Sequence, residues 1–78
     1  MEFVKGTVAK SRAGHDKGDI QTVVKVDGKY AFVCDGKKRK LEKLKRKNIK
    51  HLEGTKNVLN ECQLSSNSVI RKALSEYR

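Results

Sequence analysis

Residues 20–34 read IQTVVKVDGKYAFVC, and this stretch carries the clearest structural signal in the chain. Residues 20–26 are rich in β-branched side chains, and residues 29–34 form a second β-rich run. Asp27 and Gly28 separate the two runs. An Asp-Gly pair between two such runs is the strongest short-range indication of a β-hairpin. We therefore predict an antiparallel hairpin over this stretch and a mainly β fold.

On the N-terminal side, Thr7 and Val8 indicate a short first strand, and residues 13–19 (AGHDKGD) indicate a turn. On the C-terminal side, residues 37–52 allow two interpretations. The preferred one is strand, basic loop, strand, with a late strand over residues 48–52. The alternative is a helix over residues 38–47, which would place many like charges three and four residues apart.

The last third of the chain indicates helical structure. Thr55 is a candidate cap for a short helix that reaches Cys62, and residues 65–67 (SSN) offer N-cap side chains for a second helix over residues 68–77. Apolar residues share one face of that second helix at helical spacing: Val69, Ile70, Ala73, Leu74 and Tyr77. We expect this face to dock onto the β domain; binding in a groove of a partner protein is the alternative. The predicted organisation is a β domain over residues 1–54, with the basic segment 37–52, and a helical extension over residues 55–78.

Size and composition restrict the class of protein. The chain has 78 residues, of which 36% are apolar and 36% charged, so it is long enough for one small core. It has no apolar run near the roughly 20 residues that span a bilayer and no signal-peptide pattern at its start, so we expect a cytoplasmic monomer with no membrane partner. The two cysteines, Cys34 and Cys62, are expected to be free thiols. Their spacing to the histidines does not suit a metal site, and no catalytic pattern or cofactor motif is present.

Positive charge is concentrated in residues 37–52, KKRKLEKLKRKNIKHL, which hold nine of the nineteen Lys and Arg residues and one acid. Such a cluster repels itself unless a polyanion neutralises it, so nucleic acid is the expected partner. Arg39 and Arg46 are the best candidates for bidentate phosphate contacts. The apolar residues within the segment are expected to point inward: Leu41, Leu44, Ile49 and Leu52. The candidate phosphate ligands are Lys37, Lys38, Arg39, Lys40, Lys43, Lys45, Arg46, Lys47 and Lys50.

Three further stretches resemble one family: residues 6–19 (GTVAKSRAGHDKGD), residues 50–52 (KHL) and residues 67–74 (NSVIRKAL). Together they resemble KOW-motif proteins, above all the large-subunit ribosomal proteins of the fourteen-e group and their short bacterial relatives. The resemblance implies a small SH3-like barrel with a closing helix. It implies RNA as partner, ribosomal RNA in particular, together with ribosomal or other translation-associated proteins. Gly14 and Gly18 would let the loop backbone approach a phosphate. The site residues that these stretches add are Arg12, Gly14, His15, Lys17, Gly18 and His51.

The sequence therefore predicts a non-catalytic RNA-binding module that holds structured RNA through its phosphate backbone. The chain has only four aromatic residues, which disfavours a stacking platform for single strands. Charge alone does not separate RNA from DNA. The alternative function is a protein-interaction module of the transcription or translation machinery that uses the C-terminal helix.

Overall fold

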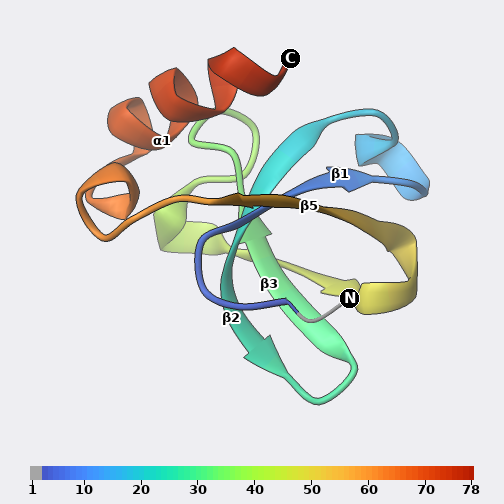
Figure 1. The fold of residues 1–78 in the computed structure, drawn as a ribbon. Helices are drawn as coiled ribbons and strands as arrows, with labels where there is room; N and C mark the ends of the chain where they lie inside the picture. The colour runs from blue at the N-terminus through green and yellow to red at the C-terminus, as the bar shows by residue number, and fades with distance from the viewer. Residues whose placement is uncertain (1–2) are drawn as a thin grey trace.

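The fold is described by a computed structural model that covers residues 3–78, apart from the side chain of His15. Its centre is a five-stranded antiparallel sheet in the spatial order β4-β3-β2-β1-β5 (Figure 1). The helix α1 (Asn67–Leu74) lies above one end of this sheet. The strands are β1 (Thr7–Ser11), β2 (Ile20–Asp27), β3 (Tyr30–Cys34), β4 (Lys45–Asn48) and β5 (Leu52–Val58). The prediction of a mainly β fold with a C-terminal helix is confirmed.

The predicted hairpin is formed by β2 and β3. Asp27 pairs with Tyr30, so the turn consists of Gly28 and Lys29. Gly28 has φ +60°. In the described part of the chain only glycines have a positive φ, so Lys29 does not. A positive φ at the first turn residue alone is the pattern of a type II′ turn, which suits the twist of a hairpin.

Strand β2 pairs with a different strand along each part of its length and contains a bulge that bends the sheet. Its first residues, Ile20 to Thr22, pair with β1, and Thr22 to Asp27 pair with β3. The pairing with β3 shifts register between Val23 and Lys25, and such a bulge bends a strand. Within residues 3–78 no pairing joins the outer strands β4 and β5, so the sheet is open.

The basic segment contains a strand, but not over the predicted residues 48–52. Strand β4 ends at Asn48, and a 3-10 turn, η3 (Ile49–His51), precedes β5. The side chain of Asn48 accepts a hydrogen bond from the backbone N–H of Lys50 at 3.0 Å, which caps the turn. The alternative helix over residues 38–47 is also absent, since only a short 3-10 turn, η2 (Leu41–Lys43), forms there. The sequence patterns therefore missed the cap by Asn48, which starts the turn η3 in place of a continuous strand.

The predicted helix after Thr55 is wrong, because residues 52–58 form β5. The hydroxyl of Thr55 donates to the carbonyl of Val8 at 2.7 Å and so joins β5 to β1. The sheet thus extends four residues past the predicted boundary at residue 54. Only a 3-10 turn, η4 (Cys62–Leu64), separates the sheet region from α1.

Helix α1 begins at Asn67, one residue before the predicted start at residue 68. Ser66, one of the three predicted cap candidates, is its N-cap, and the Ser66 hydroxyl accepts from the backbone N–H of Val69 at 3.3 Å. The α-helix ends at Leu74, and a 3-10 turn, η5 (Ser75–Tyr77), follows it directly. Ile70 and Leu74 are fully buried, whereas Val69 is 37% exposed and does not share the docked face as predicted. No helix within residues 3–78 is long and apolar enough to cross a lipid bilayer.

Two clusters of buried residues occupy opposite faces of the sheet, because neighbouring strand residues alternate between faces. The cluster beneath α1 consists of Val8, Cys34, Leu59, Ile70 and Leu74, with Leu41 and Leu44 packed against it. The cluster on the other face consists of Ala9, Val23, Ala31, Val33 and Leu52, with Ile49 packed against it. The apolar residues of the basic segment therefore point inward as predicted and fix the position of its charges.

Candidate nucleic-acid interface

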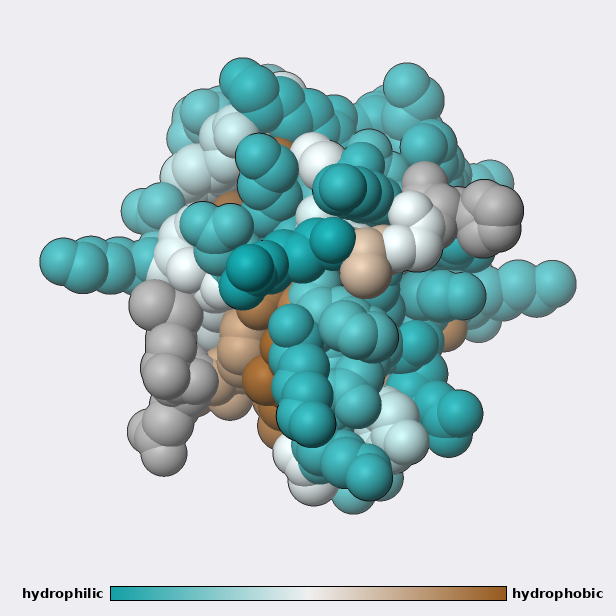
Figure 2. Space-filling model, turned by 90° about the vertical axis from the view of Figure 1, so that its right-hand side faces the viewer, coloured by the Kyte–Doolittle hydropathy of each residue, from teal (hydrophilic) through white to brown (hydrophobic). Residues whose placement is uncertain are grey.

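The β1–β2 loop and strand β4 meet along one groove, although more than twenty residues separate them in the sequence. The groove has a volume of about 310 Å³. We name it the loop–strand groove. Figure 2 views the molecule from the side of η1 and η3, and this side is hydrophilic apart from a narrow apolar strip. The groove is lined by Ala13, Gly14, Asp16, Arg39, Lys45, Arg46, Lys47, Asn48 and His51.

Asp16 fixes the loop to the basic segment. Its carboxylate accepts two hydrogen bonds from the Arg39 guanidinium, from Nε at 3.1 Å and from Nη2 at 3.2 Å. It also accepts one from Nε2 of Gln21 at 3.3 Å, and it is only 3% exposed. Gln21 is itself fully buried, so this contact ties the loop carboxylate to strand β2. The Asp of the DKG sequence therefore has a structural role.

The environment of Asp16 lowers the pKa of its carboxyl group. Burial acts to raise this pKa, but the hydrogen bonds from Arg39 and Gln21 and the charges of Arg39 and Lys47 together outweigh burial. The same ion pair raises the pKa of Arg39, chiefly through the hydrogen bond to Asp16. The ionised pair is thus the stable form of this contact in the folded protein.

We expect Asp16→Asn to lower the free energy of unfolding by about 1.5–3 kcal/mol at pH 7, since it removes hydrogen bonds between charged groups. The folded-state pKa lies below the ordinary value of 3.8, so the unfolded chain binds more protons in acid. The difference between wild type and variant should therefore be constant from pH 5 to pH 7 and shrink below pH 3.8. Urea unfolding across pH measures it.

Asp19→Asn is the matched control for this experiment. Asp19 pairs with Lys38 at 3.2 Å, but the Lys38 side chain is 59% exposed. Exposed ion pairs contribute about 0–1 kcal/mol, so this variant should unfold almost as wild type does. Equal losses in the two variants would show that Asp16 does not hold the loop.

Two predicted phosphate ligands, Arg39 and Lys47, are engaged inside the protein. Arg39 is bound to Asp16 as described above. Lys47 is 8% exposed, and its Nζ donates to the Ser11 hydroxyl and, at 3.0 Å, to the Ala13 carbonyl. The two side chains fasten the basic segment to the loop. Arg39, predicted as a bidentate phosphate ligand, is instead bidentate to a carboxylate.

The exposed charges of the groove are those of Lys45 and Arg46, two successive residues of the edge strand β4. Lys50 and His51 belong to η3 at one end of the groove and are also exposed. The backbone N–H of Arg12 donates to the His51 carbonyl at 2.8 Å, which brings the start of the loop to the same end. No ion-pair partner for Arg12, Lys17, Lys45, Arg46 or Lys50 occurs within the described part of the chain.

The loop glycines Gly14 and Gly18 are both exposed, and Gly14 lines the groove, whereas Gly18 lines a second hollow beside Asp19. Gly14 has φ +80° and Gly18 has φ +90°, and a methyl group added to either would meet no atom within 4 Å. The backbone N–H of Gly18 donates to the Ser11 carbonyl at 2.8 Å, so it serves the loop and not a ligand. The side chain of His15, another predicted ligand, lies outside the described residues.

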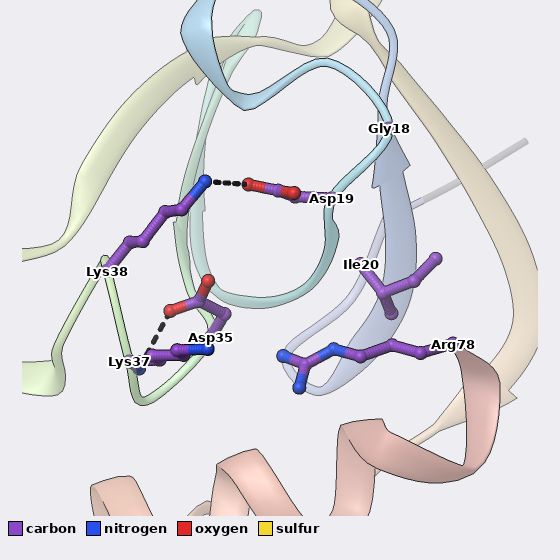
Figure 3. Close-up of a pocket in the computed structure, with 7 residues that line it drawn as sticks. All are labelled: Gly18, Asp19, Ile20, Asp35, Lys37, Lys38 and Arg78. Atoms are coloured by element: carbon purple, nitrogen blue, oxygen red, sulfur yellow. Dashed lines mark hydrogen bonds and ion pairs between the residues drawn. The ribbon is translucent and has the colours of Figure 1, made fainter.

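The remaining predicted ligands lie elsewhere. A hollow of about 350 Å³ lies between the β1–β2 loop, the turn after β3 and the C-terminus, and Figure 3 shows the residues that line it. Lys37 and Lys38 line it, but Lys38 is paired with Asp19, and the Asp35 carboxylate accepts from the backbone N–H of Lys37 at 2.8 Å. This hollow has mixed charge and suits an anion less well than the loop–strand groove does. Lys40 and Lys43 border a third hollow, beside Glu42.

The two cysteines differ in exposure, since Cys34 is buried and Cys62 is exposed. Both thiols are free, as predicted. Burial, followed by the charge of Asp35, raises the pKa of Cys34 to about 11, so this thiol stays protonated at neutral pH. Within residues 3–78 no three His, Cys, Asp or Glu side chains gather as ligands for a metal ion.

Sequence reasoning missed the groups that assemble the groove: Asp16, Gln21 and Asn48. Asp16 was visible as one of two acids in the β1–β2 loop, and an acid near a base-rich segment is a candidate for an internal ion pair. No sequence signal pointed to Arg39 as its partner, because the pairing depends on how the segment after β3 folds back beside the loop.

No protein-family model matches the chain, and no curated protein matches it either. The resemblance to KOW proteins therefore depends on the loop, the basic segment and the tail that carry it. The charge and shape of the loop–strand groove are an independent basis for a function.

Proposed function

We propose that the chain is a non-catalytic module that binds structured RNA through its phosphate backbone. One observation carries the proposal: the loop–strand groove combines an exposed glycine-containing loop with the unpaired charges of Lys45 and Arg46. Backbone N–H groups and cations that converge on one groove are the usual ligands of a phosphate backbone. Double-helical RNA is recognised mainly in this way.

The arrangement of the strands supports a KOW-type, SH3-like barrel. The glycine loop lies between two paired strands, β1 and β2, and the hairpin follows directly, as the family resemblance implies. The bulge in β2 bends the sheet, and bending brings the outer strands toward closure. We propose on this basis that the chain is related to the large-subunit ribosomal proteins of the fourteen-e group and that it acts on the ribosome.

The salt dependence of binding gives the first test. The β1–β2 loop, β4 and η3 carry five cations without an ion-pair partner in the described part of the chain, of which Lys45 and Arg46 line the groove. Each phosphate contact contributes roughly 0.7–0.9 to the slope of log K against log salt. We expect a slope of about −3.5 to −4.5 for a hairpin RNA, measured by fluorescence anisotropy at several salt concentrations. A slope near zero with retained binding would contradict a phosphate-based interface.

Sedimentation of tagged protein in native lysate tests the ribosomal assignment. We expect the protein to migrate with a large ribosomal particle at low salt and to be released at high salt, because the contacts are ionic. A control with nuclease-treated lysate should remove the fast-migrating fraction. Migration as a free protein at both salt concentrations would contradict the ribosomal assignment, whereas RNA binding itself is decided by the salt slope.

A further inference from the structure

Two of the four aromatic residues lie side by side on the outer face of the hairpin. Tyr30 and Phe32 are two residues apart in β3, so their rings project from the same face. In the register of the sheet Phe32 lies between Lys25 of β2 and Arg46 of β4. The same register places Tyr30 between Asp27 and Asn48. This aromatic face therefore extends across three strands.

Three cations lie over these rings. The Arg46 guanidinium is 4.7 Å from the centre of the Tyr30 ring, and Nζ of Lys29 is 5.9 Å from it. Nζ of Lys25 is 5.7 Å from the centre of the Phe32 ring. All three cationic side chains belong to exposed residues. Aromatic rings with mobile cations beside them are a common feature of surfaces that bind nucleotides, since they serve both the base and the phosphate.

The aromatic face is not part of either core. Neither ring belongs to the buried cluster beneath α1 or to the cluster on the other face of the sheet. Both residues are half-buried, so part of each ring is open to solvent. Helix α1 covers the end of β3 near Cys34, and the hairpin extends away from it (Figure 1). The fold thus leaves uncovered the half of this face that carries Tyr30 and Phe32.

Arg46 joins the aromatic face to the loop–strand groove. It lines the groove, and it also lies over the Tyr30 ring. We infer that the aromatic face stacks unpaired nucleobases of the RNA whose backbone lies in the groove. A strand that leaves a helix held in the groove would pass Arg46 and place its bases against Tyr30 and Phe32, with its phosphates near Lys25 and Lys29.

The charge of the face favours nucleotides over an apolar peptide. The face carries three cations, Lys25, Lys29 and Arg46, and one acid, Asp27. A polyanion is therefore attracted to it, whereas an uncharged partner would have to remove water from the cations without replacing it by a charge. The guanidinium plane of Arg46 is itself a stacking surface for a base. This inference rests on the proposed RNA function and specifies the part of the RNA that is bound: a junction of paired and unpaired nucleotides.

Three RNAs test the inference with the unmodified protein. The first is a blunt hairpin, the second is the same hairpin with a four-nucleotide overhang, and the third has the same overhang without bases. The two overhang RNAs carry equal phosphate charge, so they differ only in what can stack. We expect the overhang with bases to bind about tenfold more tightly than the abasic one, given the usual contribution of base–aromatic stacking. Equal affinities would overturn the inference.

Paired variants assign the effect to the two rings. The variant Tyr30→Leu/Phe32→Leu lacks both rings, so its tenfold preference for the overhang with bases should fall to about onefold. The variant Tyr30→Phe/Phe32→Tyr keeps two aromatic rings and should keep the preference. A preference that survives in a folded Leu variant would overturn the assignment to this face. Wild-type binding to the blunt hairpin without preference for bases would remove the inference and leave the proposed function intact. No binding to any of the three RNAs would remove both.

Discussion

Gly36→Ala is expected to lower the free energy of unfolding by about 3–5 kcal/mol, one of the two largest effects that the structure predicts. Gly36 lies in the turn after β3 and has φ +78°. A Cβ atom at this position would lie 2.2 Å from the carbonyl oxygen of Asn67 and 3.1 Å from the backbone N of Arg71. Both contacts are with backbone atoms of α1, so no side-chain rotation relieves them.

The expected loss of stability in Gly36→Ala has two parts, the strained backbone of residue 36 and a shift of helix α1. The left-handed backbone alone costs about 1–2 kcal/mol for any residue with a Cβ atom. To relieve the clash α1 must also shift, and this disturbs the burial of Ile70 and Leu74, which are worth about 1.5–3 kcal/mol each when fully buried. A domain of this length has about 4–12 kcal/mol in total, so the loss is a large share of its stability.

Gly28→Ala is the control, measured beside Gly36→Ala by thermal and urea unfolding. Gly28 also has a positive φ, +60°, but an added Cβ would meet nothing within 4 Å. The free energy of unfolding of Gly28→Ala should fall only by the cost of the strained backbone, about 1–2 kcal/mol. Because each kcal/mol shifts the Tm of a small domain by about 4–8 °C, the two variants should differ clearly. Similar Tm values would show that Gly36 does not set the distance between the turn and α1.

Local sequence signals predicted the elements that local interactions decide. The hairpin of β2 and β3 followed from two β-rich runs and Asp27-Gly28, and the start of α1 followed to within one residue from the cap candidates at residues 65–67. Residues 52–58 were missed because Thr55 resembles a helix cap, whereas its hydroxyl is used to bind Val8 of β1. That choice depends on a strand 47 residues away, which a local pattern does not contain.

The candidate site was predictable in charge but not in geometry. The clustering of bases over residues 37–52 is a property of composition, and a sequence shows it directly. Which bases are free is a property of packing: Arg39 binds Asp16, and Lys47 is buried against Ser11 and Ala13. These partners belong to the end of β1 and to the β1–β2 loop. Which cations bind inside the protein and which stay exposed is therefore decided only when the basic segment lies beside them.

The same division gives the largest predicted effect on binding. Lys45→Glu/Arg46→Glu should weaken binding to a hairpin RNA about 100- to 1,000-fold at physiological salt. Both residues are exposed and line the groove, and a hydrogen bond to a charged group contributes about 1.5–3 kcal/mol. Two lost contacts therefore amount to about 3–4 kcal/mol or more, and each 1.4 kcal/mol is a factor of about ten. Fluorescence anisotropy measures the affinity, and circular dichroism confirms that each variant is folded.

Lys40→Glu/Lys43→Glu separates the groove from the overall charge. Each double variant changes the net charge from +10 by −4, to +6, so both alter the general field of the protein equally. Lys40 and Lys43 are exposed but border a different hollow, beside Glu42. At physiological salt the screening length is about 8 Å, so cations away from the bound phosphates act only weakly. We expect this control to lose about tenfold or less. If the two variants lose equally, attraction is a property of the whole basic segment, and the loop–strand groove has no special part in it; if only the first variant loses, the RNA backbone lies where the loop and β4 meet.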